Sequence, residues 1–185
     1  MFDSFNAAAA TPPGLQLDLL LPLLLSWWIA WGDIKTRRVP NYLTLAGALA
    51  GLGFQLGYHG WPGLKEGGLG LVLGLGLLMP FYLLGGLGAG DVKALAAMGA
   101  WLGPWRTLIL FAYMGLAGGL LALGVLWWRG LLGAKLRQAW TFLVNRLLLR
   151  HAQAATRTSP SPQVPGLPYG VALALGMAVL WWRAP

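Results

Sequence analysis

The stretch Gly88-Ala89-Gly90-Asp91-Val92-Lys93 decides the fold expected of this chain. It places a carboxylate between apolar runs, although the whole sequence holds only five acidic residues. A carboxylate beside a membrane span is energetically costly and usually has a function. The glycines before it permit backbone geometries and close approaches that other residues forbid. The best candidate for a partner is Asp33, in Gly32-Asp33-Ile34-Lys35.

The composition predicts an all-α, polytopic integral membrane protein that forms one domain over residues 1–185. Hydrophobic residues make up 57% of the chain and charged residues 10%, whereas a soluble domain has about 25% charged residues. The net charge of +8 comes mostly from basic residues in two loops, which is typical of topology signals and not of nucleic-acid binding. With no cysteine and two isolated histidines, the sequence predicts no disulfide, no metal site and no cofactor.

Six apolar segments predict about six transmembrane helices. The first is expected to be a retained span, because residues 1–14 contain no Lys or Arg and so lack the basic region of a signal peptide. The fourth is shorter than the roughly 20 residues that a bilayer requires, so it begins upstream of Asp91 or is buried among the others. The expected spans are Leu15–Asp33, Tyr42–Tyr58, Gly67–Leu84, Asp91–Leu102, Trp105–Trp128 and Leu167–Trp182.

Glycine spacing predicts where these spans pack against one another. Glycines four residues apart, which let helices approach closely in lipid, occur at Gly47 and Gly51, Gly53 and Gly57, Gly70 and Gly74, and Gly115 and Gly119.

The distribution of Lys and Arg predicts that residues 34–41, 85–90 and 129–166 face the cytoplasm and that both termini lie outside. Asp33 and Asp91 then share the cytoplasmic end of their spans. Within the basic loop at 129–166, residues 129–151 resemble an interfacial helix, and this loop is expected to bind anionic lipid.

Two carboxylates that share one proton provide an acid and a base in one site. The ionised group takes a proton from water, which attacks an amide carbonyl, while the protonated group polarises that carbonyl. Lys35 and Lys93 each follow an aspartate by two residues, so on a helix they point away from it and are expected to reach lipid headgroups. The alternative is that each aspartate only marks the end of a span.

Three segments resemble motifs of the prepilin peptidase family, the membrane aspartyl proteases with a Gly-x-Gly-Asp motif. The stretch 88–93 resembles that motif, and residues 33–41, which end in Pro40-Asn41, resemble the segment that holds the first aspartate. Pro168-Tyr169-Gly170 is similar to a third feature, although Val171 stands where many members have a second proline. The resemblance extends from about residue 15 to residue 183.

The resemblance implies a bacterial inner-membrane protease that removes the leader peptide of type IV prepilins or pseudopilins at the cytoplasmic face. It implies Asp33 and Asp91 as the catalytic residues. Longer members carry a cytoplasmic domain with paired cysteines and methylate the new pilin N-terminus; this sequence has no cysteine and resembles the short, peptidase-only form of tight-adherence (Flp) pilus systems. The supporting motif positions are Pro40, Asn41, Gly88, Gly90, Lys93, Pro168, Tyr169 and Gly170.

The residues also leave two functions of other classes open. A small proton-coupled carrier would likewise have paired intramembrane acids and glycine-rich helices. However, the segments around Asp33 and Asp91 share only Asp-x-Lys, and no inverted repeat is visible. A non-enzymatic membrane subunit of a secretion machine is the second alternative.

Overall fold

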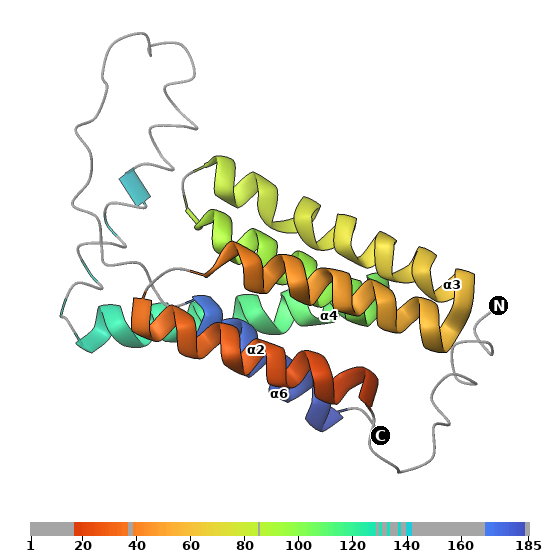
Figure 1. Ribbon diagram of the computed structural model, residues 1–185. Coiled ribbons are helices and arrows are strands. Elements are labelled where there is room, and N and C mark those ends of the chain that lie inside the picture. The colour runs from red at the N-terminus through yellow and green to blue at the C-terminus, as the bar shows by residue number, and fades with distance from the viewer. Residues whose placement is uncertain are drawn as a thin grey trace, which may run out of the picture. The chain divides into compact units, whose positions relative to one another are not determined.

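The part of the chain that the computed structural model describes contains helices and no strands, so the predicted all-α class is confirmed for it (Figure 1). Two of its helices, α3 and α4, are long and apolar enough to cross a membrane. The described residues are 17–36, 39–84, 86–128, 130, 133, 137, 140, 141 and 169–183. The helices are α2 (Leu17–Thr36), α3 (Asn41–Leu83), α4 (Ala89–Trp128) and α6 (Tyr169–Arg183).

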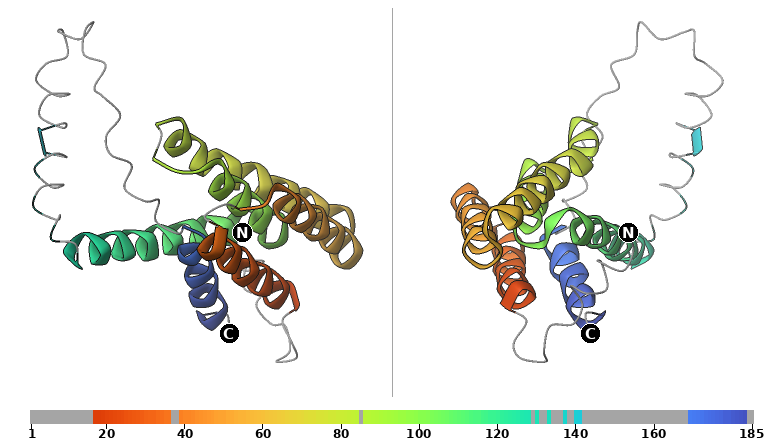
Figure 2. Two further views of the ribbon diagram at one scale, coloured as in Figure 1. Left: turned by 60° about the vertical axis from the view of Figure 1, so that its left-hand side comes forward. Right: turned by 90° about the vertical axis from the view of Figure 1, so that its right-hand side faces the viewer.

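The helices α3 and α4 each contain one break, where the chain reverses direction (Figures 1 and 2). Gly60 has φ 64° and ψ −151°, and Gly103 has φ 72° and ψ 175°, conformations that only glycine adopts readily. Pro62 and Pro104 follow within two residues, in the first turn of the next segment, where no helical hydrogen bond needs their N–H. The breaks lie where the sequence ends its second and fourth expected spans.

Three helix boundaries differ from the expected spans. The helix α2 continues to Thr36, so Asp33 lies inside its last turn and not at its end. The second and third expected spans are joined by helical residues in α3, and α4 begins at Ala89, two residues before Asp91. Hydropathy marks only the apolar part of a helix, whereas the backbone hydrogen bonds continue into the polar residues beside it.

The chain divides into two units, which we describe separately. The first comprises Met1–Gly118 and Pro168–Pro185, and the second comprises Gly119–Leu167. Within the second unit, the structure describes the end of α4 and five further residues. The predicted interfacial helix at 129–151 and the third-motif residue Pro168 therefore lie largely or wholly outside the described residues.

The first segment of α4 forms the core of the first unit. Val92 and all residues from Ala94 to Gly103 are buried, and most of them are alanine or glycine. A helix that is surrounded by other helices does not need the full length of a lipid-exposed span. Both explanations of the short fourth apolar segment therefore hold: α4 begins upstream of Asp91, at Ala89, and its first segment is buried.

Glycines let α3 approach this central segment backbone to backbone. A Cβ atom at Gly70 would overlap the carbonyl oxygen of Gly99 and would lie 2.8 Å from the carbonyl carbon of Gly103. At Gly74 it would lie 2.8 Å from the carbonyl oxygen of Leu95. These distances leave no room for a side chain, which confirms the packing role predicted from the spacing of Gly70 and Gly74.

The prediction holds for only half of the glycine pairs. Side chains lie within 3 Å of a Cβ at Gly47 and at Gly51. By contrast, no atom of the described residues lies within 4 Å of a Cβ at Gly53, Gly57, Gly115 or Gly119, so within the described part of the chain these four glycines do not have the predicted packing role. Spacing places two glycines on one face of a helix, but it does not determine whether another helix covers that face.

Polar side chains satisfy the backbone groups around the break in α4. Gln55 donates from Nε2 to the carbonyl of Trp101 at 2.7 Å, and Trp101 donates from Nε1 to the carbonyl of Gly47 at 2.8 Å. The Thr107 hydroxyl donates to the carbonyl of Gly103 at 2.6 Å. Because buried carbonyls require partners, these bonds stabilise the break and attach it to α3.

An ion pair joins α2 and α4 at the end remote from Asp33. Arg106 Nη1 lies 3.0 Å from Asp18 Oδ2. The charge distribution of the sequence assigns both residues to the same side of the membrane, and the contact agrees with that assignment. Because both side chains are partly exposed, the pair contributes at most about 1 kcal/mol to stability.

We expect Gly70→Ala to destabilise the protein by about 1–3 kcal/mol, because the new methyl group has no space against Gly99 and Gly103. The matched control is Gly76→Ala in the same helix, where no atom lies within 4 Å of the added Cβ. This change should be neutral or stabilising, since alanine favours helix by about 1 kcal/mol over glycine. Thermal unfolding in detergent measures both, and equal midpoints would contradict the packing described.

Candidate active site

Asp33 is held in the interior by the first turn of α6. Its side chain is only 8% exposed, and its Oδ2 accepts a hydrogen bond from the backbone N–H of Gly170 at 2.9 Å. The helices α2 and α6 pack against each other, which brings the start of α6 to the last turn of α2 (Figure 1). A buried carboxylate requires such a donor, and a helix N-terminus offers backbone N–H groups and a favourable dipole.

Gly170 cannot carry a side chain in this arrangement. A Cβ atom there would lie 2.9 Å from Asp33 Cβ, 3.0 Å from Asp33 Oδ2 and 3.3 Å from Ala30 Cα. The sequence singled out Gly170 only as part of a motif. The structure adds its physical role: the missing side chain lets the N–H reach the carboxylate.

Asp91 is the third residue of α4 and caps the N-terminus of that helix. Its Oδ2 accepts a hydrogen bond from the Gly88 N–H at 3.2 Å, and its own N–H donates to the Gly88 carbonyl at 3.1 Å. This is the acidic half of a capping box, in which the third residue reaches back to the residue before the helix. A Cβ at Gly88 would lie 3.2 Å from Asp91 Oδ2, so glycine keeps the approach to this carboxylate open.

The two carboxylates and a phenol come together at this end of the first unit. Asp33 lies within electrostatic range of Asp91, and Asp91 lies within electrostatic range of Tyr169. The three side chains come from α2, α4 and α6, which are far apart in the sequence.

The remaining motif residues hold the first turn of α4 against Val39, in the α2–α3 connection, and against Asn41, the first residue of α3. A Cβ at Gly90 would lie 3.0 Å from Val39 Cβ, and Lys93 Nζ donates to Asn41 Oδ1 at 2.9 Å. Pro40 precedes α3 in an extended conformation, and its carbonyl accepts a hydrogen bond from the N–H of Leu43. Lys93 therefore has a protein partner, where the sequence predicted lipid headgroups.

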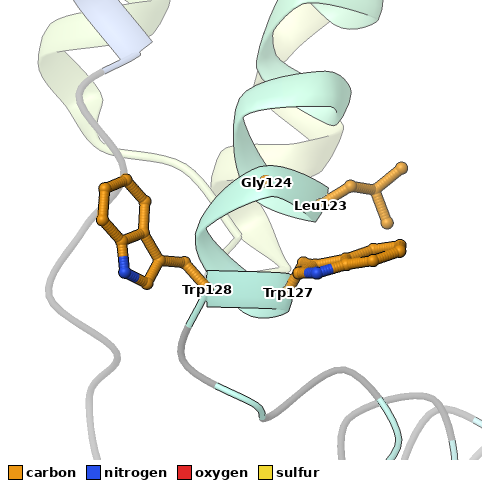
Figure 3. Close-up of a pocket in the computed structure, with 4 residues that line it drawn as sticks. All are labelled: Leu123, Gly124, Trp127 and Trp128. Carbon is orange, nitrogen blue, oxygen red and sulfur yellow. The ribbon is translucent and has the colours of Figure 1, made fainter.

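A pocket elsewhere in the described residues is apolar. It lies at the end of α4, in the second unit, encloses about 770 Å³ and is lined by Leu123, Gly124, Trp127 and Trp128 (Figure 3). Since none of these side chains can donate or accept a proton in catalysis, this pocket is not the candidate site. Among the described residues, no group of three or more His, Cys, Asp or Glu side chains is placed to hold a metal ion.

A comparison of the sequence with known protein families supports the interpretation of these motifs. A profile of the type IV leader peptidase family matches residues 19–123, more than half of the chain. The chain belongs to this family. The matched part of this leader peptidase homologue includes both Asp33 and Asp91, and it ends before Tyr169 and Gly170.

Several relatives carry the name prepilin leader peptidase/N-methyltransferase. The protein from Aeromonas hydrophila is 35% identical over 118 residues, which cover 58% of this chain and 40% of the relative. The Escherichia coli K12 protein is 38% identical over 95 residues (48% and 41%), and the Klebsiella pneumoniae protein is 43% identical over 106 residues (52% and 45%). The chain thus spans less than half the length of these relatives. No solved structure matches it.

We expect Gly170→Ala to lower the stability of the protein by about 1.5–3 kcal/mol, the usual contribution of a hydrogen bond to a charged group. The added methyl group would separate the Gly170 N–H from Asp33. Gly32→Ala is the matched control, because Gly32 is adjacent to Asp33 and no atom lies within 4 Å of its Cβ position. Heating followed by size-exclusion chromatography compares the two, and a Gly170→Ala protein as heat-resistant as the control would contradict the role of this bond.

Proposed function

We propose that the chain is an aspartyl endopeptidase that removes the leader peptide from type IV (Flp-like) prepilins or pseudopilins. Asp33 and Asp91 are its catalytic residues, and cleavage takes place at the cytoplasmic face of the inner membrane. The observation that carries the proposal is that these two carboxylates, from two separate family motifs, lie within electrostatic range of each other, each at the start of a helix whose backbone N–H it accepts or whose first turn it closes. Membership of the leader peptidase family supports it.

In the proposed mechanism, the two carboxyl groups share one proton. The ionised group removes a proton from a water molecule, whose oxygen attacks the carbonyl carbon of the scissile amide. The protonated group donates a hydrogen bond to the carbonyl oxygen. As the tetrahedral intermediate collapses, the C–N bond breaks and the leaving nitrogen receives a proton from the pair. Because the proton belongs to the pair, activity should fall on both sides of a pH optimum.

The hydrogen bonds of the two carboxylates leave one oxygen atom of each available for these roles. Each carboxylate binds a backbone N–H through its Oδ2, Asp33 that of Gly170 and Asp91 that of Gly88. Among the described residues, Oδ1 of neither carboxylate accepts a hydrogen bond. The Oδ1 atoms are therefore the ones that we assign to the attacking water and the substrate carbonyl.

Exposed apolar side chains near the aspartates in sequence suit an apolar segment of the substrate. Ile34, Tyr42, Leu83 and Leu84 border the site in sequence, and each is at least 60% exposed. The leader peptides of the family are typically basic, as are the loops of this protein, so charge attraction does not explain recognition. We propose that the hydrophobic stem of the prepilin docks between the spans and brings the cleavage site to Asp33 and Asp91.

We further propose that these 185 residues cleave without methylating the new N-terminus. In the longer members, paired cysteines belong to an additional cytoplasmic domain, and this chain has no cysteine. The relatives that combine both activities in their names match the chain over 40–45% of their length. A carrier or a non-enzymatic secretion subunit would not cleave a prepilin, so one assay separates all three functions.

We expect Asp33→Asn and Asp91→Asn each to abolish cleavage of a prepilin in membranes. Asparagine nearly keeps the shape of aspartate, but it cannot exchange a proton. Because the two residues act as one unit, the double variant should be little worse than either single variant. The readout is the mobility shift of the prepilin on a gel, with the amount of enzyme determined by immunoblot.

Asp18→Asn is the matched control for this experiment. It makes the same substitution in the same helix as Asp33, but Asp18 pairs with Arg106 at the other end of α2. Its cleavage activity should stay near that of the parent. Near-normal cleavage by either active-site variant would contradict the aspartyl protease proposal and favour the carrier or the subunit.

A labelling experiment tests the proposed orientation, in which the aspartates face the cytoplasm and both termini lie outside. The parent has no cysteine, so a single introduced cysteine reports its own location. In intact cells, a membrane-impermeant maleimide should label Lys65→Cys, on the proposed outer side, and spare Thr158→Cys. In inside-out vesicles the pattern should be reversed, and in lysed cells both cysteines should react. Labelling of Thr158→Cys in intact cells would overturn the orientation.

A further inference from the structure

Two contacts that involve neither carboxylate hold α4 against the α2–α3 connection. The first is the hydrogen bond of 2.9 Å from Lys93 Nζ to Asn41 Oδ1. The second is the approach of Gly90 to Val39, where a Cβ would come within 3.0 Å of Val39 Cβ. The connection runs from the helical turn that holds Asp33 to the first residue of α3, so these contacts link the two segments that supply the aspartates.

The positions of Asp91 and Lys93 on α4 give the hydrogen bond a geometric consequence. Residues two apart in a helix point to nearly opposite sides. Accordingly, Lys93 contacts the start of α3, whereas Asp91 lies within electrostatic range of Asp33 and Tyr169. A bond on one side of the first turn of α4 thus fixes the rotation of that turn, and with it the direction of the carboxylate on the other side.

We propose that Lys93 and Asn41 are positioning residues, whose hydrogen bond sets the orientation of Asp91 toward Asp33. This inference rests on the proposed function, because the orientation matters for a shared proton and a common substrate. The residue types suit the task. The long lysine side chain spans the space between α4 and α3, and its charge strengthens the bond. The amide oxygen of Asn41 accepts the bond without adding a further charge to the first turn of α3.

Kinetics of prepilin cleavage test the role of the pair. Lys93→Ala and Asn41→Ala should each lower kcat by roughly 10- to 100-fold, the range expected for a misplaced catalytic group, and leave KM within about twofold. The double variant should be no worse than either single variant, because both remove the same bond. Lys35→Ala is the matched control, since Lys35 follows Asp33 with the same spacing and is exposed.

An exchange of the two side chains distinguishes positioning from a general need for lysine at this site. The variant Lys93→Asn/Asn41→Lys again pairs an amine with an amide oxygen, and it should recover at least tenfold in kcat over Lys93→Ala. Failure of the exchange to recover activity, or additive losses in the double alanine variant, would overturn the proposal.

A measurement that needs no activity separates this inference from the proposed function. Spin labels are attached at Ile34→Cys and Ala89→Cys, two exposed positions close in sequence to the aspartates. Dipolar EPR should show a broader distance distribution in Lys93→Ala and Asn41→Ala than in the parent, and an unchanged one in Lys35→Ala. A parent that does not cleave prepilin would refute the proposed function alone. Unchanged distributions in both alanine variants, or equal broadening in Lys35→Ala, would refute the positioning role.

Discussion

The hydrogen bond from the Gly170 N–H to Asp33 is the interaction on which the arrangement at this end of the protein depends. It satisfies a carboxylate that is 8% exposed, and a bond of this kind contributes about 1.5–3 kcal/mol. It also determines where α6 begins relative to α2. Tyr169, the residue before Gly170, is thereby placed in the electrostatic neighbourhood of Asp91. One backbone donor thus organises groups from three helices.

A second constraint is the tight packing of glycines around the first segment of α4. Gly70 and Gly99 meet backbone to backbone, and Gly74 lies against Leu95 in the same way. The break at Gly103 lets the chain turn at the far end of this segment, with its carbonyl bound by the Thr107 hydroxyl. The first segment of α4, which carries Asp91 as its third residue, is therefore held over its whole buried length, which gives the carboxylate a rigid base.

Much of this structure could be predicted from the sequence because the signals are local. Apolar runs identify the helices, and the breaks at Gly60 and Gly103 lie where the second and fourth expected spans end. Helix ends were less accurate, because hydropathy does not report hydrogen bonds that continue through polar residues such as Lys35 and Thr36. The spacing of Gly53 and Gly57 identified a face but not its neighbour, since the neighbour is a property of the tertiary arrangement.

The candidate site likewise has features that the sequence could predict and features that it could not. A scarcity of acids made Asp33 and Asp91 conspicuous, and the motifs named Gly170, Lys93 and Asn41. What the sequence could not provide was the partner of each. The Gly170–Asp33 bond joins residues 137 positions apart, and the Lys93–Asn41 bond joins residues 52 apart. No periodicity or propensity encodes such distances, which follow only from the packing of α6 on α2 and of α4 on α3.

The separation between Asp33 and its donor has a consequence for biosynthesis. When α2 leaves the ribosome, the N–H that will bind its carboxylate belongs to a residue that is still to be translated, 137 positions later. Until then, the carboxyl group of Asp33 lacks its backbone donor, and its hydrogen bond must come from water. Completion of the carboxylate's environment is therefore coupled to the late insertion of α6, and a nascent chain that stalls before Gly170 leaves it unfinished.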